Sequence, residues 1–185
     1  MKARVKITKS GAPKLTHLRV KKALGAPSSG HLMAGSIVLA CSLGRGGITR
    51  LKREGDGKSP AGRFALRGGF IQPERLKGAG RAPALVPARA DLGWCDDPGN
   101  ANYNRPIKLP NPAGHEIIRR VDGLYDVVIV LDYNLRPRKR GAGSAIFFHL
   151  TRAPGEPTAG CVAIDRQAMR RLLPRLSKKA VMVIA

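Results

Sequence analysis

Glycine and proline interrupt this chain so often that short strands joined by turns are favoured over a bundle of long helices. The 185 residues include 22 glycines and 14 prolines, and these two residue types terminate helices and populate turns. Hydrophobic residues make up 43% of the chain, which suits a globular domain with a packed core. The sequence therefore predicts a mainly β protein with one or two helices.

The strongest strand signal is a pair of apolar segments in the second half of the chain. "LYDVVIVLDYN" (124–134) is rich in β-branched residues, and "SAIFFHL" (144–150) follows it after the basic turn "LRPRKRGAG". Together they predict a hairpin with a basic tip. Strands are also expected within 35–52 and at "RFALRGGF", whereas 72–115 predicts a long irregular excursion of the kind that often carries function.

The two ends of the chain give different signals. Asp165 is expected to cap a helix, which Pro174 distorts or ends, and "AVMVIA" predicts a final strand. One face of that helix carries apolar residues at helical spacing, namely Met169, Leu172, Leu173 and Leu176. Residues 1–30 predict a basic arm or edge strands that precede a domain over 31–185. The apolar run at 32–44 is interpreted as a buried strand, because it is too short to span a membrane and is broken by Gly and Ser.

The charge of the chain is strongly positive. Lys and Arg total 34 against 12 acidic residues, which gives a formal net charge of +22 and a pI near 11.2. Such a field attracts polyanions, whether nucleic acid, anionic lipid or an acidic wall polymer. A nucleic-acid-binding module is one alternative, although the chain has only four Phe, three Tyr and one Trp for stacking on bases.

Three cysteines, Cys41, Cys95 and Cys161, are too far apart for a zinc-binding CxxC pair. Their odd number leaves at least one free thiol, and a disulfide between two of them stays open. Cys41 lies in an apolar strand and is expected in the core, and Cys95 is expected to be structural. No metal site or cofactor is expected, because the other candidate ligands are scattered: His17, His31, His115, Asp96 and Asp97. Asp96 and Asp97 could instead position a substrate amine, but two adjacent acids in a loop usually cap a turn.

The segment "HLTRAPGEPTAGCVAI" (149–164) contains the best candidate for chemistry. A thiol becomes a nucleophile when a base takes its proton, and histidine is the usual partner. His149 ends a predicted strand twelve residues before Cys161, and the intervening prolines and glycines allow the chain to return. Gly160 permits a tight turn whose amides can stabilise an oxyanion, and Thr158 can hydrogen-bond within it. The alternative is a small buried thiol, since cysteine is among the most buried residue types.

Two motifs resemble the YkuD-type L,D-transpeptidase catalytic family. "FFHL…PTAGCVAI" is similar to that family's signature, and "SPAGRF" (59–64) to its Thr-Pro-x-Gly-x-Phe segment. The chain departs from the pattern at Ala159, where a second histidine is usual, and at Ala163, where Asn or Arg is usual. The region from "GWCDDPGN" onward resembles a proteobacterial branch without the second histidine, which is associated with crosslinks between L-Ala and diaminopimelate.

The resemblance implies a YkuD-like β-sandwich or barrel with a long irregular loop and one or two short helices. It also implies a wall enzyme in which Cys161 attacks a stem-peptide carbonyl, His149 acts as base and then acid, and backbone near Gly160 binds the oxyanion. An amine would resolve the thioester to a crosslink; water would make the protein an L,D-peptidase or carboxypeptidase. Candidate substrate contacts are Thr158, Arg140, Arg152, Arg105, Trp94 and Tyr103.

The expected partners are donor and acceptor stem peptides, with no nucleic acid and no membrane span. Wall chemistry predicts a periplasmic or cell-wall location, although no clear signal peptide follows Met1. The oligomeric state stays open.

Overall fold

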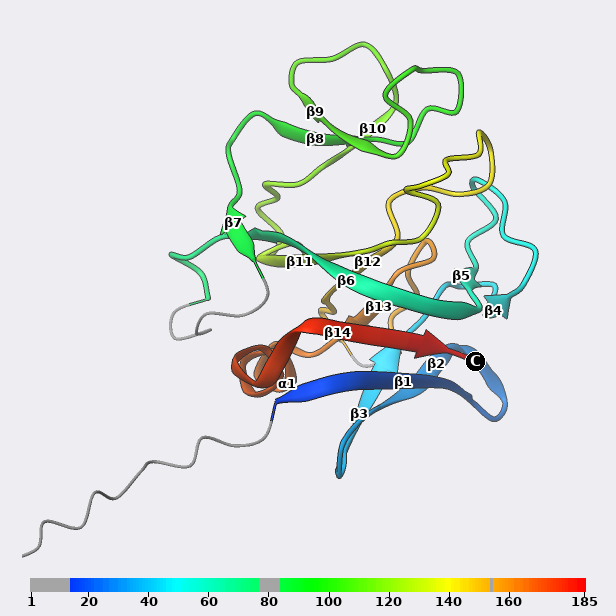
Figure 1. Cartoon of the computed structure of the whole chain (residues 1–185), viewed down its shortest axis with the longest axis vertical. Helices are drawn as coiled ribbons and strands as arrows, with labels where there is room; N and C mark the ends of the chain where they lie inside the picture. The colour runs from blue at the N-terminus through cyan, green and yellow to red at the C-terminus, as the bar shows by residue number, and fades with distance from the viewer. Residues whose placement is uncertain (1–13, 77–83, 154) are drawn as a thin grey trace, which may run out of the picture.

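A large β-sheet forms the body of the molecule in the computed structural model, which describes residues 14–76, 84–153 and 155–185 (Figure 1). Nine strands follow one another in this sheet, and a further pairing of β11 with β6 closes it into a barrel-like ring with β7 attached to β6. In order across the sheet they are β11 (Val127–Leu131), β12 (Phe147–Leu150), β13 (Val162–Ile164), β3 (Ile37–Ser42), β2 (Ala26–Ala34), β1 (Leu15–Ala23), β14 (Leu176–Ile184), β6 (Gly62–Ile71) and β7 (Leu85–Pro87).

The expected mainly β fold is therefore confirmed, and the hairpin predicted from 124–150 is present. β11 and β12 pair antiparallel, with Val128 opposite His149 and Val130 opposite Phe147. Every residue of β11 is buried, because one side of the strand faces the interior of the ring and the other faces the covering segments.

The N-terminal strands differ from the expected arm or edge position. β1 lies inside the sheet, paired with β2 on one side and with β14 on the other. Its alternating pattern explains this placement: Leu18 and Val20 point into the core, whereas Arg19 and Lys21 are exposed on the outer face. The part of the predicted arm at residues 1–13 lies outside the described residues.

Within the excursion at 72–115, of which residues 77–83 lie outside the described ranges, the chain is more regular than the sequence predicted. It contributes most of a second, three-stranded sheet in the order β10 (His115–Ile117), β8 (Leu92–Cys95) and β9 (Arg105–Lys108). This small sheet lies at the top of Figure 1, on the opposite side of the large sheet from the helix. Its strands are only three or four residues long. The Pro, Gly and Asn residues around them therefore dominate the local pattern, and the sequence does not predict the strands.

The C-terminal helix forms as predicted. α1 (Arg166–Leu172) begins after Asp165, whose side chain accepts hydrogen bonds from the amides of Gln167 and Ala168. A 3-10 turn at Leu173–Arg175 follows, because Pro174 cannot continue the helix, and the chain enters β14. No helix within the described ranges is long and apolar enough to cross a membrane.

A last strand pair, β4 (Ile48–Thr49) and β5 (Ser59–Pro60), is short and parallel. It brings the start of the "SPAGRF" segment close to the turn at residues 158–160, as a bridge between Gly44 and Thr158 also indicates. The fold therefore joins the two sequence motifs at one place.

Candidate active site

Two neighbouring parallel strands carry the histidine and the cysteine of the sequence motif. β12 and β13 pair so that Phe148 is opposite Val162 and His149 is opposite Ala163. Cys161 directly precedes β13 and lies beside Phe147, whose amide donates a hydrogen bond to the Cys161 sulfur at 3.3 Å. Side chains two residues apart on a strand share a face, so His149 and Phe147 project on the same side of the sheet.

The Cys161 thiol is buried and protonated in this resting structure. Its side chain is 7% exposed, and Sγ donates a hydrogen bond to the Ala145 carbonyl oxygen at 3.2 Å. Burial raises the pKa of the Cys161 thiol to about 12, against a lowering influence of the Phe147 amide. Desolvation therefore outweighs the positive charge of Lys52, which by itself would favour the thiolate.

The His149 ring is held in one tautomer. It is 5% exposed, and Nδ1 lies 2.8 Å from the Leu150 carbonyl oxygen. A carbonyl oxygen only accepts, so Nδ1 carries the hydrogen and Nε2 keeps a lone pair. Burial lowers the pKa of His149 to about 4, and the edge-to-face ring of Tyr125, with centroids 5.1 Å apart, fixes the imidazole plane. At neutral pH the ring is an uncharged base.

The turn before Cys161 is fastened by hydroxyl groups. Thr158 Oγ1 donates to the Cys161 carbonyl oxygen at 2.8 Å and accepts from the Gly160 amide at 3.1 Å. Ser59, fully buried at the start of the "SPAGRF" segment, donates to the same carbonyl at 3.3 Å and accepts from the Gly44 amide at 2.9 Å. The two motifs are therefore joined at the backbone of Cys161.

A cavity of about 340 Å³ connects these groups. His149, Cys161 and Thr158 line it from the large sheet and the preceding turn. Asp96 and Glu116 line it from the small sheet, which therefore covers the nucleophile. A thiol, an uncharged imidazole and an enclosed space beside them are the elements that acyl transfer through a thioester requires.

A comparison with protein-family models agrees with this chemistry. The L,D-transpeptidase catalytic domain (YkuD) model matches residues 29–184. The chain belongs to this family. No curated protein and no solved structure matches it. L,D-transpeptidase domains act on peptidoglycan, so the substrate class follows from the family.

The two positions that depart from the L,D-transpeptidase signature both line the cavity. Ala159 and Ala163 present methyl groups where larger polar side chains are usual. Ala163 is the direct cross-strand neighbour of His149. These alanines leave space next to the base and the thiol.

The cavity lining does not include Trp94, Tyr103, Arg105 or Arg140 among the residues proposed from the sequence to contact substrate. Trp94 packs edge-to-face on Phe147 at 5.2 Å, and its Nε1 donates to Asn104 at 3.0 Å, so it supports the strand that carries His149. The Tyr103 hydroxyl is buried against the Glu54 carboxylate, and burial together with that carboxylate raises the pKa of Tyr103.

The proposed arginines divide into one that lines the cavity and two that do not. Arg152 lines it, but its guanidinium also forms an ion pair with Glu156, four residues later in the chain. Arg105 and Arg140 are exposed, on β9 and on the tip of the hairpin. The Gly160 amide, proposed for the oxyanion, donates to Thr158 here.

Three polar residues of the site were not singled out for it from the sequence. Ser59 was noted only as part of a family-like segment, and Glu54 and Glu116 had no motif spacing. The sequence offered one signal for the acidic residues, namely their small number. Because the chain has only 12 of them, several around one cavity require an explanation.

The remaining cysteines and histidines lie apart from the cavity. Cys41 and Cys95 are buried free thiols, so no disulfide links them. Cys41 belongs to the main core, and burial raises the pKa of its thiol to about 12. Within the described part of the chain, no group of three or more His, Cys, Asp or Glu residues is arranged to hold a metal ion.

Proposed function

We propose that this protein is a cysteine L,D-transpeptidase that joins peptidoglycan stem peptides through a thioester on Cys161. The observation that carries the proposal is the meeting of Cys161 and His149 in one cavity, on adjacent strands of a chain that belongs to the L,D-transpeptidase family. A structural thiol alone would not require an uncharged histidine with a free ring nitrogen beside it.

The first step is acylation of Cys161 by the donor stem peptide. Substrate displaces the thiol hydrogen from the Ala145 carbonyl, and His149 Nε2 takes the proton as sulfur attacks the peptide carbonyl. The C–S bond forms, the C–N bond breaks, and the imidazolium returns the proton to the leaving amine. Backbone amides of the turn at Gly160 and Cys161 are the donors proposed for the oxyanion; this requires Gly160 to release Thr158.

The second step transfers the acyl group to an amine of a neighbouring stem. That amine forms the new C–N bond as the C–S bond breaks, and the thiol is regenerated. We assign the crosslink to L-Ala and diaminopimelate, because Ala159 and Ala163 mark the branch that the sequence resembles and open space around the thioester. The wall substrate assigns the protein to the periplasm or cell wall. The basic surface favours attraction to the carboxylate-rich wall.

The test is incubation of the protein with purified disaccharide-tetrapeptides that contain diaminopimelate, followed by mass spectrometry of protein and products. We expect a covalent adduct on Cys161 and crosslinked dimers, and fragmentation of the dimers identifies the bond. Trimmed monomers without dimers would assign the protein as a peptidase instead.

Matched variants separate chemistry from folding. Cys161→Ala and His149→Gln should abolish the adduct or slow it by about a hundredfold or more. Cys95→Ala and His31→Gln remove the same groups away from the cavity and should retain it. An active Cys161→Ala protein would refute the proposal, and salt-dependent DNA binding without any adduct would favour a nucleic-acid-binding module.

A further inference from the structure

The carboxylates of this protein are distributed unevenly with respect to its cations. All 12 acidic residues lie within the described ranges, and eight of them form ion pairs with Lys or Arg there. The four without such a pair in the described ranges are Glu54, Asp96, Asp97 and Asp165. In a chain with 34 Lys and Arg residues, an acidic side chain without a cation is unusual.

Two of these four have a clear local role. Asp165 caps α1, and Asp97 accepts a hydrogen bond from the Gly99 amide at 2.8 Å within its own turn. The other two, Glu54 and Asp96, line the cavity that contains Cys161. Glu116 is a third cavity carboxylate, and its ion pair with Arg120 is long, at 3.7 Å.

The three carboxylates lie close enough for their charges to interact, Glu54 with Asp96 and Asp96 with Glu116. Glu54 accepts hydrogen bonds from Tyr103 and, at 2.7 Å, from Ser144, which orient it but leave its charge unneutralised. Partial burial and then the Glu54 charge raise the pKa of Asp96, and burial raises the pKa of Glu116. A cation bound between them would relieve both effects.

A second feature of the same cavity is the hydrogen bonding of His149. His149 is 95% buried, as its exposed fraction of 5% implies, and its Nδ1 is bonded to Leu150. Within the part of the chain that the structure describes, no group donates a hydrogen bond to its other ring nitrogen, Nε2; the Leu124 carbonyl oxygen, which is also within reach of the ring, can only accept. A buried, unprotonated nitrogen lining a cavity beside unneutralised carboxylates fits a ligand that donates N–H groups.

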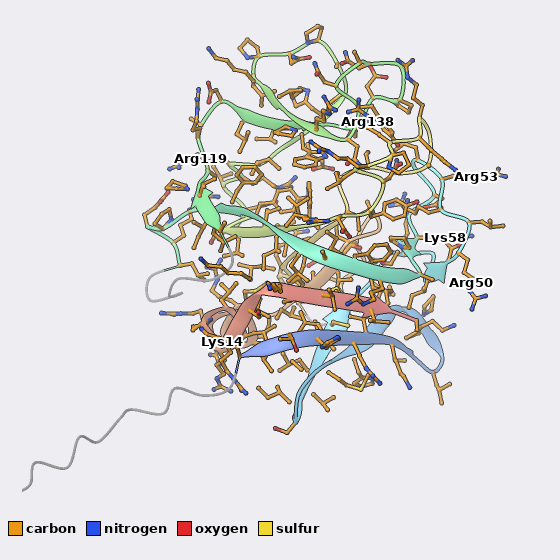
Figure 2. All side chains as sticks on the ribbon, in the orientation of Figure 1. Lys14, Arg50, Arg53, Lys58, Arg119 and Arg138 are labelled. Carbon is orange, nitrogen blue, oxygen red and sulfur yellow. The ribbon has the colours of Figure 1, made fainter. Side chains whose placement is uncertain are left out.

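Most cations of the protein lie outside the cavity. Figure 2 labels six, which extend from Lys14 at the bottom of the view to Arg138 near the top, with Arg50, Arg53 and Lys58 along one side. Among the described residues, three cations line the cavity: Lys52 is held by Asp56 at 2.5 Å, Arg152 by Glu156, and the Arg45 guanidinium lies against Gly57. The acidic part of the cavity is thus a local exception on a basic molecule.

We propose that Glu54 and Asp96 bind the primary ammonium group of the second, acyl-accepting substrate. This inference rests on the proposed function and assigns the acceptor side of that reaction. The carboxylates concentrate a cationic amine beside the thioester in preference to water. The bound ammonium passes one proton to His149 Nε2; the neutral amine then forms the C–N bond while the C–S bond breaks, and its second proton goes to the departing sulfur. The imidazolium then releases its proton to water, which restores the neutral base.

The first test compares acylation with transfer in Asp96→Asn, using the diaminopimelate-containing disaccharide-tetrapeptide as donor and acceptor. We expect the rate of thioester formation in Asp96→Asn to stay within about twofold of the wild-type rate. The ratio of dimer to hydrolysed monomer should be at least about tenfold lower than in the wild type, because one charged hydrogen bond to the acceptor is lost. Glu54→Gln should shift the ratio in the same direction. Asp97→Asn, which removes the adjacent charge outside the cavity, should leave the ratio unchanged.

The second test measures binding without chemistry, in a Cys161→Ala background. The tetrapeptide with a free ammonium should bind about tenfold more weakly when Asp96→Asn is added, and the same peptide with that amine acetylated should bind both proteins equally. An unchanged ratio of dimer to hydrolysed monomer in Asp96→Asn would overturn the inference. A loss confined to thioester formation would also overturn it, because the bound ammonium would then belong to the donor peptide. Absence of any thioester in the wild-type protein would instead refute the proposed function.

Discussion

The Cys161 sulfur donates its hydrogen bond to the Ala145 carbonyl oxygen at 3.2 Å. The nucleophile is therefore stored as a neutral thiol, beside an imidazole that is also neutral because burial lowers its pKa to about 4. In this state the pair differs from a preformed thiolate and imidazolium, and activation depends on substrate entering the cavity. Burial and the raised pKa also slow the reaction of this thiol with oxidants.

The first prediction concerns thiol reactivity in the absence of substrate. Because burial raises the pKa of Cys161 to about 12, iodoacetamide at pH 8 should modify it about a hundredfold more slowly than an exposed cysteine. The rate should rise steadily from pH 7 to pH 10. Peptide mapping by mass spectrometry measures each cysteine separately, and Cys41, whose pKa is also raised to about 12, serves as an internal comparison. A plateau near pH 6–7 would indicate a thiolate–imidazolium pair and contradict the structure.

The second prediction concerns stability below neutral pH. His149 is uncharged when folded and has a pKa of about 4, whereas an unfolded histidine has a pKa near 6.5. Between these values the unfolded state binds more protons, so stability is full above pH 6.5 and falls as the pH is lowered toward 4. The contribution of this residue to the fall is about 3 kcal/mol.

Urea unfolding followed through the single tryptophan, Trp94, measures this effect at several pH values. His149→Gln removes the titrating group, so its unfolding free energy should depend less on pH over the same interval. Equal pH dependence in the two proteins would show that other groups account for the loss.

The elements of the fold were predictable where local pattern and tertiary environment agree. β11 and β12 are apolar and β-branched, and α1 has both a capping aspartate and an apolar face, so each was expected from a short window. The position of β1 was not predictable in this way, because its lysines suggest either a basic arm or an exposed edge strand. Its neighbours β2 and β14 are determined by long-range pairing, which no short window contains.

The site was predictable only in part, for the same reason. Cys161, His149 and Thr158 lie within one short motif, so sequence spacing brought them together. Ser59 is 102 residues from Cys161, and only the closing of the sheet brings its hydroxyl to the Cys161 carbonyl. Asp96 belongs to a loop whose small sheet covers the cavity, an arrangement that composition did not predict.

The third prediction tests whether Thr158 holds the nucleophile in position. Thr158→Val removes the hydroxyl that bonds both the Cys161 carbonyl and the Gly160 amide. We expect a loss of about 1–2 kcal/mol in unfolding free energy and a slower acylation by about tenfold or more. Thr158→Ser keeps the hydroxyl and should retain most of the acylation rate. Equal rates in the two variants would show that the hydroxyl does not position Cys161.

The last prediction concerns the backbone at Gly160. Its φ of +142° is strained for any other residue, and an added Cβ would lie 2.8 Å from the Lys58 carbonyl oxygen. Gly160→Ala should therefore lower the unfolding free energy by about 2 kcal/mol or more and displace the adjacent nucleophile.

Gly141→Ala is the matched control for this change, because Gly141 also has a positive φ, +71°, but an added Cβ would meet nothing within 4 Å. It should cost only about 1 kcal/mol and leave acylation unchanged. Denaturant unfolding and the rate of adduct formation on Cys161 are measured for both variants. If Gly160→Ala cost no more than Gly141→Ala and acylated at the wild-type rate, close contact with the Lys58 backbone would not be what positions the turn.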